Sequence, residues 1–213
     1  RIEEDSDVLV GDESTGEQHV ERVTIIKEWC VSNTSRRSVH CEMCESVCMF
    51  GTSGVRGRFG DTITPEFAAS LGHALAACDY DHIVIGQDAR TTSPLLADAA
   101  SSALRGAGVD VVRAGRVATP TLARGVSLTN ADAGLMVTAS HNPPTDNGFK
   151  LWSPSGQAFN EPRRDAIEDA LEAGNEITAS WDSVGNETTV SDLTESHVND
   201  LCDVVDIGGD VSV

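Results

Sequence analysis

The sequence predicts an α/β fold: a layered α/β/α domain with a mainly parallel sheet, preceded by an irregular N-terminal extension and followed by the truncated start of a second domain. From residue 49 onward, short apolar runs of strand length alternate with segments of helical periodicity. Hydrophobic residues make up 39% of the 213 residues, and aromatic residues only 4%. The core must therefore come mainly from Ala, Val, Leu and Ile, as in helices packed on a parallel sheet.

The first half of this pattern predicts a helix, a strand, a second helix and a second strand. Thr64 is a predicted N-cap, because a proline follows it at the first helical position. The β-branched run at 82–86 predicts a buried strand, and QDAR follows it as a turn. Ser93 is predicted to cap the next helix, again before a proline, and a short strand is expected at 109–113.

The second half predicts a shorter helix at 120–127 and a strand at 133–138, which ends abruptly in the polar loop ASHNPPTDNG. Because ligands of doubly wound sheets bind beyond the carboxyl ends of the strands, this loop is a predicted functional site. Residues 148–159 are expected to form a hairpin, and Asn160 is predicted to cap a helix over 161–173.

The chain divides into three predicted parts. Residues 1–48 lack sustained periodicity, and a natural start at Met49 would make them an upstream extension, disordered or not native. Residues 49–175 form the predicted α/β domain. Residues 176–213 become polar and contain one short helical pattern at 197–205, so we expect a linker and the truncated start of a second domain.

The charge of the chain limits its partners. It has 34 acidic residues against 15 basic ones, and the formal net charge of −19 repels nucleic acid and anionic lipid. No stretch approaches the roughly 20 apolar residues needed to cross a bilayer, and the acidic start differs from a secretory signal. We therefore expect a cytoplasmic protein that binds neither nucleic acid nor membranes.

The same acidic, lysine-poor composition predicts a salt-loving, halophilic source, because molar salt screens the self-repulsion of such a surface. We expect the melting temperature to rise with KCl concentration, as measured by thermal denaturation across a KCl series. Equal melting temperatures in dilute buffer and in molar salt would contradict the halophilic interpretation.

The predicted extension carries most of the cysteines, and a small zinc site is one interpretation of them. His40, Cys41, Cys44 and Cys48 form H-C-x-x-C-x-x-x-C, and Cys30 could add a ligand. The pattern lacks the second paired half of a strong zinc signature, so an unstructured extension is the alternative. Disulfides are not expected to organise the fold, because the cysteine spacing differs from that of an extracellular framework.

Two motifs carry the predicted chemistry. GTSGVRG, at 51–57, offers close backbone approach at its glycines and a planar fork of donors on Arg56, and this combination suits a phosphate. TASHNPP, at 138–144, presents a hydroxyl on Ser140 that could act as a nucleophile or carry a phosphate. The alternative for the second motif is an ordinary turn whose polar side chains bond to nearby backbone.

GTSGVRG, followed later in the chain by TASHNP and then by GFK, resembles the first domain of the α-D-phosphohexomutase family over about 49–206. This family comprises phosphoglucomutases and phosphomannomutases and includes phosphoglucosamine mutases. The resemblance implies an isomerase that interconverts hexose 1-phosphate and hexose 6-phosphate through a hexose 1,6-bisphosphate. It implies a hexose phosphate as the partner and leaves the choice among glucose, mannose and glucosamine phosphates open.

The resemblance also implies which residues form the site. Ser140 would be held as a phosphoserine that donates and accepts the phosphoryl group. Lys150, from GFK, would be the general acid or base, and Arg56 would stabilise the transferring phosphoryl group. Lys150 is also the only lysine after Met49, so this chain retains there a cation whose pKa can be lowered. The implied catalytic residues are Ser140, Lys150, Arg56 and His141, and the implied phosphate-binding residues are Thr52, Ser53, Gly54 and Asn142.

Mg²⁺ is implied as the cofactor, bound to Ser140 through its phosphate, together with hexose 1,6-bisphosphate as an activator. In the family, a D-G-D-G-D-R type loop of the second domain supplies the metal-binding aspartates. This sequence lacks that loop, and it also lacks the sugar-selecting and distal phosphate-binding loops. We therefore expect the fragment alone to have little or no mutase activity.

Two other classes of function stay open at this point. A non-catalytic phosphosugar-binding remnant would share every one of these local motifs. A nucleotide-binding Rossmann domain is a weaker alternative, because GTSGVRG opens the fold before any long strand and lacks the G-x-G-x-x-G spacing.

Overall fold

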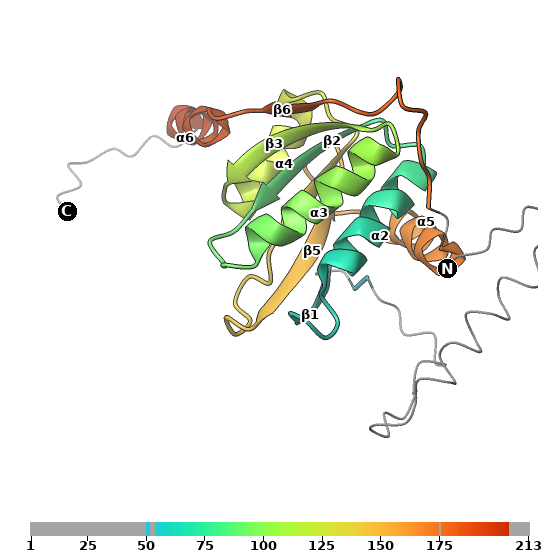
Figure 1. The fold of residues 1–213 in the computed structure, drawn as a ribbon. Coiled ribbons are helices and arrows are strands. Elements are labelled where there is room, and N and C mark those ends of the chain that lie inside the picture. Colours follow the sequence, from blue (N-terminus) through green and yellow to red (C-terminus); the bar gives the residue numbers. More distant parts are fainter. Residues whose placement is uncertain (1–49, 52–53, 175, 205–213) are drawn as a thin grey trace, which may run out of the picture. The chain divides into compact units, whose positions relative to one another are not determined.

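The computed structural model describes residues 50–51, 54–174 and 176–204 (Figure 1). Within this part of the chain the strands are β1 (Val55–Arg58), β2 (His82–Gln87), β3 (Asp110–Arg116), β4 (Ala133–Val137), β5 (Asp146–Trp152) and β6 (Glu187–Thr189). The helices are α2 (Pro65–Ala77), α3 (Ser93–Gly106), α4 (Thr119–Leu128), α5 (Glu161–Ala173) and α6 (Leu193–Val204). The predicted extension and its cysteine cluster lie outside the described residues.

The strands form one sheet in the order β1-β5-β4-β2-β3-β6. β2 pairs in parallel with both β3 and β4, and β6 pairs in parallel with β3. β5 is antiparallel to β4, and β1 is antiparallel to β5. The predicted α/β class with a mainly parallel sheet is thus confirmed, with two antiparallel pairings at one side of the sheet.

Helices cover both faces of the sheet, and the strand residues alternate between them. Ile83 and Ile85 of β2 pack in the larger core cluster, with side chains of α2, α3 and α5, whereas Val84 between them packs in a second cluster with α4 and α6. The period of two along a strand produces this division. Figure 1 shows α2 and α3 on one face and α4 on the other, which confirms the α/β/α layers.

Two of the three predicted helix caps are confirmed, and one is wrong. The Thr64 side chain accepts a hydrogen bond from Phe67 N–H, and the Asn160 side chain accepts one from Arg163 N–H. Ser93, by contrast, is the first residue of α3 rather than its cap. Its hydroxyl donates instead to the Asp88 carboxylate at 2.6 Å, so a tertiary contact has replaced the local capping bond.

Several boundaries differ from the sequence prediction. β1 was expected to be a phosphate-binding loop, and β6 was expected to be part of a linker. β6 extends the domain's own sheet, and Leu193 at the start of α6 is buried in the second core cluster. The predicted hairpin over 148–159 closes with a single bridge between Trp152 and Ala158 rather than with a second strand. No helix among the described residues has the length and apolar character of a membrane span.

Replacing Gly148 with alanine is expected to destabilise the domain by about 1–3 kcal/mol, the usual cost of overpacking. Gly148 is paired with Arg56 of β1, and a Cβ atom at Gly148 would lie 2.3 Å from the backbone oxygen of Val55. Urea unfolding measures the effect. Gly106→Ala is the matched control, because a Cβ atom there meets nothing within 4 Å and alanine favours the helix. Equal free energies of unfolding for the two variants would contradict this packing argument.

Candidate active site

The loop that contains TASHNPP connects β4 to β5 at the carboxyl end of β4. β2 is the parallel neighbour of β4, so the residues that follow β2 lie beside this loop. The Asp88 N–H donates to the Val137 carbonyl at 3.0 Å, and the Thr138 N–H donates to the Gly148 carbonyl at 2.8 Å. The loop is therefore attached on one side to the end of β2 and on the other to β5.

Ser140 lies on an exposed turn in an unusual backbone conformation. The Asn142 N–H donates to the Ala139 carbonyl at 3.1 Å, which closes the turn, and Ser140 at its first central position has φ +54°. Left-handed backbone costs an L-residue roughly 1–2 kcal/mol, so the surrounding structure must hold it there. Thr138 is one such contact, because its Oγ1 accepts the Ser140 N–H at 2.9 Å.

Lys150 of β5 reaches the Ser140 side chain. Its Nζ donates a hydrogen bond to Ser140 Oγ at 3.0 Å. Burial lowers the pKa of the Lys150 ammonium below its ordinary value, and the positive charge of Arg56 lowers this pKa further. A lysine of lowered pKa gives up its proton more readily, and here that proton lies within hydrogen-bond distance of the serine oxygen.

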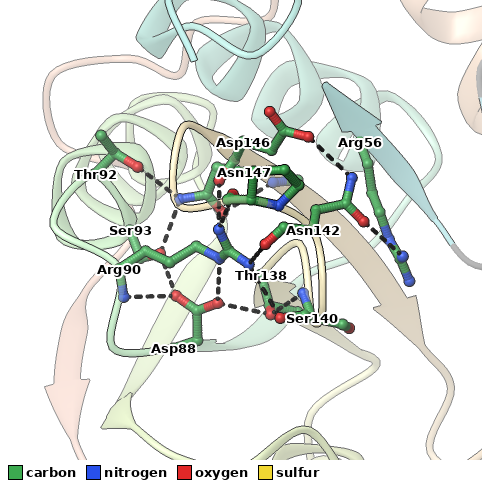
Figure 2. A network of polar contacts seen from close by, with 12 residues as sticks. Arg56, Asp88, Arg90, Thr92, Ser93, Thr138, Ser140, Asn142, Asp146 and Asn147 are labelled. Atoms are coloured by element: carbon green, nitrogen blue, oxygen red, sulfur yellow. Dashed lines mark hydrogen bonds and ion pairs between the residues drawn. The ribbon is translucent and has the colours of Figure 1, made fainter. Parts of the chain in front are cut away.

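β1 brings Arg56 to the same loop. Its pairing with β5 sets Arg56 opposite Gly148, and Arg56 Nη1 lies 3.4 Å from Asn142 Oδ1. The Asn142 amide is held from its other end, because Nδ2 donates to Asp146 Oδ2 at 3.0 Å. The two sequence motifs therefore meet: Arg56 lies beside Asn142 (Figure 2), and Lys150 bonds to Ser140 two residues earlier in the same turn.

Gly54 allows the first motif to approach Lys150. Its φ is +83°, and a Cβ atom there would lie 2.2 Å from the Phe149 oxygen and 2.9 Å from Lys150 Cγ. Only glycine fits this position without moving β5. His141 is exposed next to Ser140 on the turn, whereas Thr52 and Ser53 lie outside the described residues.

Two residues of the site, Asp88 and Arg90, were not predicted. They belong to the QDAR segment after β2, which was assigned only as a turn. Figure 2 shows both beside the loop, joined to each other and to loop residues by hydrogen bonds. The signal that could have found them is their position, because the carboxyl ends of neighbouring parallel strands meet at one edge of a sheet.

Asp88 is held ionised at the base of the loop. It accepts hydrogen bonds from Ser93 Oγ at 2.6 Å, from Thr138 Oγ1 at 2.8 Å and from Arg90 Nε at 3.1 Å. Burial by itself would raise the pKa of this carboxyl, but the hydrogen bonds and the Arg90 charge outweigh burial and lower its pKa. Asn147, fully buried, adds hydrogen bonds from Nδ2 to Thr92 Oγ1 and Ser93 Oγ, both at 2.9 Å.

The described residues do not by themselves make a magnesium site. No group of three or more His, Cys, Asp or Glu side chains in this part of the chain is arranged to hold a metal ion. The two carboxylates beside the loop already accept hydrogen bonds from other side chains: Asp88 from Arg90 and Asp146 from Asn142. The carboxylates of this part of the chain therefore do not supply a complete set of metal ligands.

Ser140 is open to solvent rather than enclosed in a cavity. A cavity of about 140 Å³ lies behind Lys150, lined in part by Gly54 and Arg164. A larger one, of about 540 Å³, lies between α4, the turn after β5 and α6, and none of the predicted site residues lines it. Ser140 is thus exposed, and the cavity of about 540 Å³ belongs to another part of the domain.

An α/β domain that presents a serine beside a lysine and an arginine, at the carboxyl end of its sheet, defines a class of proteins suited to phosphorylated ligands. A family model described as phosphoglucomutase/phosphomannomutase, alpha/beta/alpha domain I, matches residues 48–178. The chain belongs to this family of mutases, as the sequence motifs predicted.

Known relatives agree with this assignment. The "Probable phosphoglucosamine mutase" of Methanothermobacter thermautotrophicus is 40% identical over 161 residues, which cover 75% of this chain and 36% of the relative. The "Phosphopentomutase" of Thermococcus kodakarensis is 37% identical over 157 residues, which cover 74% of this chain and 34% of the relative. The chain therefore spans about a third of the length of the curated relatives that it matches.

A solved structure has the same fold. The phosphoglucomutase/phosphomannomutase family protein of Burkholderia thailandensis matches with a TM-score of 0.59 and 29% sequence identity. The match covers 71% of this chain and 34% of that one. The layered domain described above is thus found in a crystal structure of the same family.

Proposed function

We propose that this chain supplies the phosphoserine side of a phosphohexomutase active site, in which Ser140 carries the phosphoryl group that is exchanged with a sugar phosphate. The observation that carries the proposal is the 3.0 Å hydrogen bond from Lys150 Nζ to Ser140 Oγ. It joins the only lysine after Met49 to the side chain whose oxygen would form and break the bond to phosphorus.

The chemistry assigns each of these two groups a task. When phosphorylated Ser140 reacts, the bond between Oγ and phosphorus breaks, and a bond forms between phosphorus and a sugar hydroxyl oxygen. Lys150 gives its proton to the departing Oγ, and the proton of the sugar hydroxyl passes to water. In the reverse transfer Ser140 attacks the other phosphate of the bisphosphate, Lys150 takes up the Ser140 hydroxyl proton, and the departing sugar oxygen takes a proton from water. The net reaction moves the phosphoryl group between two positions of one sugar.

The remaining predicted residues would surround the phosphoryl group. A phosphoserine adds about −1.5 to −2 charges at neutral pH, and Arg56, which contacts Asn142 of the same turn, would offset part of this charge. His141 would lie on the exposed side of the turn next to the phosphate. Thr52, Ser53 and Gly54 would complete the phosphate-binding loop, with Gly54 giving the close approach to Lys150.

Mg²⁺ and hexose 1,6-bisphosphate belong to the same proposal. Mg²⁺ would bind an oxygen of the Ser140 phosphate and would supply charge neutralisation during transfer. The bisphosphate would phosphorylate Ser140 in enzyme that has lost its phosphate. The support for both is the family to which the chain belongs, together with the chemistry of a phosphoserine beside two cations.

The proposed division into an extension at 1–48, a phosphoserine domain at 49–175 and a linker with the start of a second domain at 176–213 carries over from the sequence, with the change that β6 and the start of α6 pack on the phosphoserine domain. Because the chain spans about a third of the curated relatives that it matches, the complete reaction is proposed for the full-length gene product. For the chain of 213 residues alone, we propose little or no turnover.

The sugar is tested most directly with a panel of phosphates. Relatives of this chain are named phosphoglucosamine mutase and phosphopentomutase, so the panel contains the 1-phosphates of glucosamine, glucose, mannose and ribose. The full-length gene product is assayed with Mg²⁺ and a trace of the matching bisphosphate. Turnover of one of the hexose phosphates supports the proposal and ranks the sugars. Binding of sugar phosphates without turnover would contradict it and favour a non-catalytic phosphosugar-binding protein.

A further inference from the structure

The Arg90 side chain is surrounded by backbone carbonyl groups of the Ser140 loop. Nη1 donates to the carbonyls of Pro143 at 2.6 Å and Asp146 at 2.9 Å. Nη2 donates to the carbonyls of Ser140 at 3.0 Å and Asn142 at 2.8 Å. The side chain is only 13% exposed. One guanidinium thus binds four carbonyl oxygens of a single loop, and Figure 2 shows it beside that loop.

The orientation of the guanidinium is itself fixed. Nε donates to Asp88 Oδ2 at 3.1 Å, and the Arg90 N–H donates to Asp88 Oδ1 at 3.0 Å. Asp88 also accepts from Thr138 Oγ1, which in turn accepts the Ser140 N–H. The carboxylate is therefore connected to both sides of the Ser140 peptide: to its N–H through Thr138 and to its carbonyl through Arg90.

These bonds affect the surroundings of the phosphoryl group, because they determine which way the backbone carbonyl groups of the loop point. Carbonyl oxygens carry partial negative charge, and a doubly negative phosphate is destabilised wherever such oxygens face it. In this loop the four carbonyls are bound to Arg90, whereas Ser140 Oγ faces Lys150. The same bonds hold Ser140 at its positive φ, which no local sequence preference provides.

We propose that Arg90 and Asp88 are positioning residues for the phosphoserine, and that Arg90 directs the loop carbonyls to itself so that Ser140 Oγ is presented to Lys150. The inference rests on the proposed function of Ser140 and adds the residues that fix its geometry. Neither residue touches Ser140 Oγ in the structure, so each acts through the loop backbone. A lysine could not replace Arg90, because a single ammonium cannot span four carbonyls as a planar fork does.

The test compares Arg90→Lys with Arg105→Lys. Arg105 also donates from Nε to a backbone carbonyl, that of Gly185 at 3.1 Å, but it lies on α3 away from the loop. In the full-length gene product, Arg90→Lys is expected to lower kcat by about 10²-fold, the usual effect of a misplacement near 1 Å. KM is expected to change little, and the fraction of Ser140 that the bisphosphate phosphorylates should fall in parallel with kcat. Arg105→Lys should keep the wild-type kcat.

A second readout does not depend on activity. Hydrogen exchange of the peptide over residues 138–147 is expected to be faster in Arg90→Lys than in wild type, with Arg105→Lys unchanged there. Asp88→Asn, which keeps the shape of the side chain and removes its charge, should show both effects to a smaller degree. It provides the test if Arg90→Lys fails to fold.

The outcomes separate this inference from the proposed function. An inactive wild type would contradict the proposed function. Hydrogen exchange of residues 138–147 in the variants would then test by itself whether Arg90 and Asp88 hold the loop. With an active wild type, a kcat of Arg90→Lys or Asp88→Asn that equals that of Arg105→Lys would overturn the inference, whether or not loop exchange changes. Loss of kcat without any change in loop exchange would overturn it as well, because Arg90 would then act other than through the loop.

Discussion

Ser140→Ala is expected to lower the turnover of the full-length gene product by more than about 10⁴-fold, as removal of the nucleophile does in other enzymes with covalent intermediates. The reason is that no phosphoryl group can be held between the two transfers once Oγ is absent. The side chain is exposed, so the free energy of unfolding should change by no more than about 0.5 kcal/mol. Initial rates under saturating sugar phosphate, together with urea unfolding, measure the two effects.

Ser155→Ala is the matched control for this substitution. Ser155 is another exposed serine in a turn, and its hydroxyl bonds to Ser153 at 2.9 Å, away from Ser140 and Lys150. We expect its turnover to equal that of the wild type. Turnover that survives in Ser140→Ala at a similar level would mean that Ser140 does not carry the phosphoryl group.

Replacing Lys150 with methionine is the second prediction with a large effect. Kcat is expected to fall by about 10²- to 10⁴-fold, the range in which a general acid or base contributes. The hydrogen bond to Ser140 Oγ would be lost, and the serine oxygen would depart without a proton donor. The lowered pKa of Lys150, caused by burial and by Arg56, supports a role in proton transfer.

Lys150→Arg separates proton transfer from charge. Arginine keeps the positive charge, but its pKa lies far above neutral pH, so it cannot exchange a proton there. We expect kcat of Lys150→Arg to fall by at least about 10²-fold, as in Lys150→Met. A Lys150→Arg enzyme with nearly full kcat would show that Lys150 acts only as a cation. The unfolding transitions of both variants should match that of the wild type, which excludes loss of fold as the cause.

The central strands of the sheet could be predicted, because a strand buried on both faces consists of a continuous run of apolar residues. The run at 82–86 consists of β-branched and apolar residues, and the structure assigns it to β2 with Ile83 and Ile85 on one face and Val84 on the other. Caps that rely on a bond within one turn were also predictable. Thr64 and Asn160 are examples, since each side chain bonds to an N–H three residues later.

The edges of the sheet could not be predicted, because they depend on long-range pairing. β6 has three exposed residues without strand periodicity, and it exists only because β3 offers a free edge. β1 reads as a glycine-rich loop, yet it pairs with β5 through a contact that requires Gly148. Ser93 shows the same principle at a helix start, where Asp88 competes for its hydroxyl.

The site divides in a similar way. Ser140, Lys150 and Arg56 belong to motifs that resemble a known family, so their proximity could be expected. Arg90 contacts that loop almost entirely through backbone carbonyls, which any sequence of loop residues could provide. Nothing in the residue types of the loop therefore pointed to Arg90, and only the adjacency of β2 and β4 brings it there.

The central claim is that Ser140 carries the phosphoryl group, and phosphopeptide mapping tests it most directly. The full-length gene product, wild type and Ser140→Ala, is incubated with hexose 1,6-bisphosphate and Mg²⁺, digested, and analysed by mass spectrometry. We predict one phosphoryl group on the wild-type peptide that contains residues 138–147, located on Ser140, and no phosphoryl group on the same peptide of Ser140→Ala. A wild-type protein that remains unphosphorylated at Ser140, or that carries its phosphate on another residue, would contradict the account.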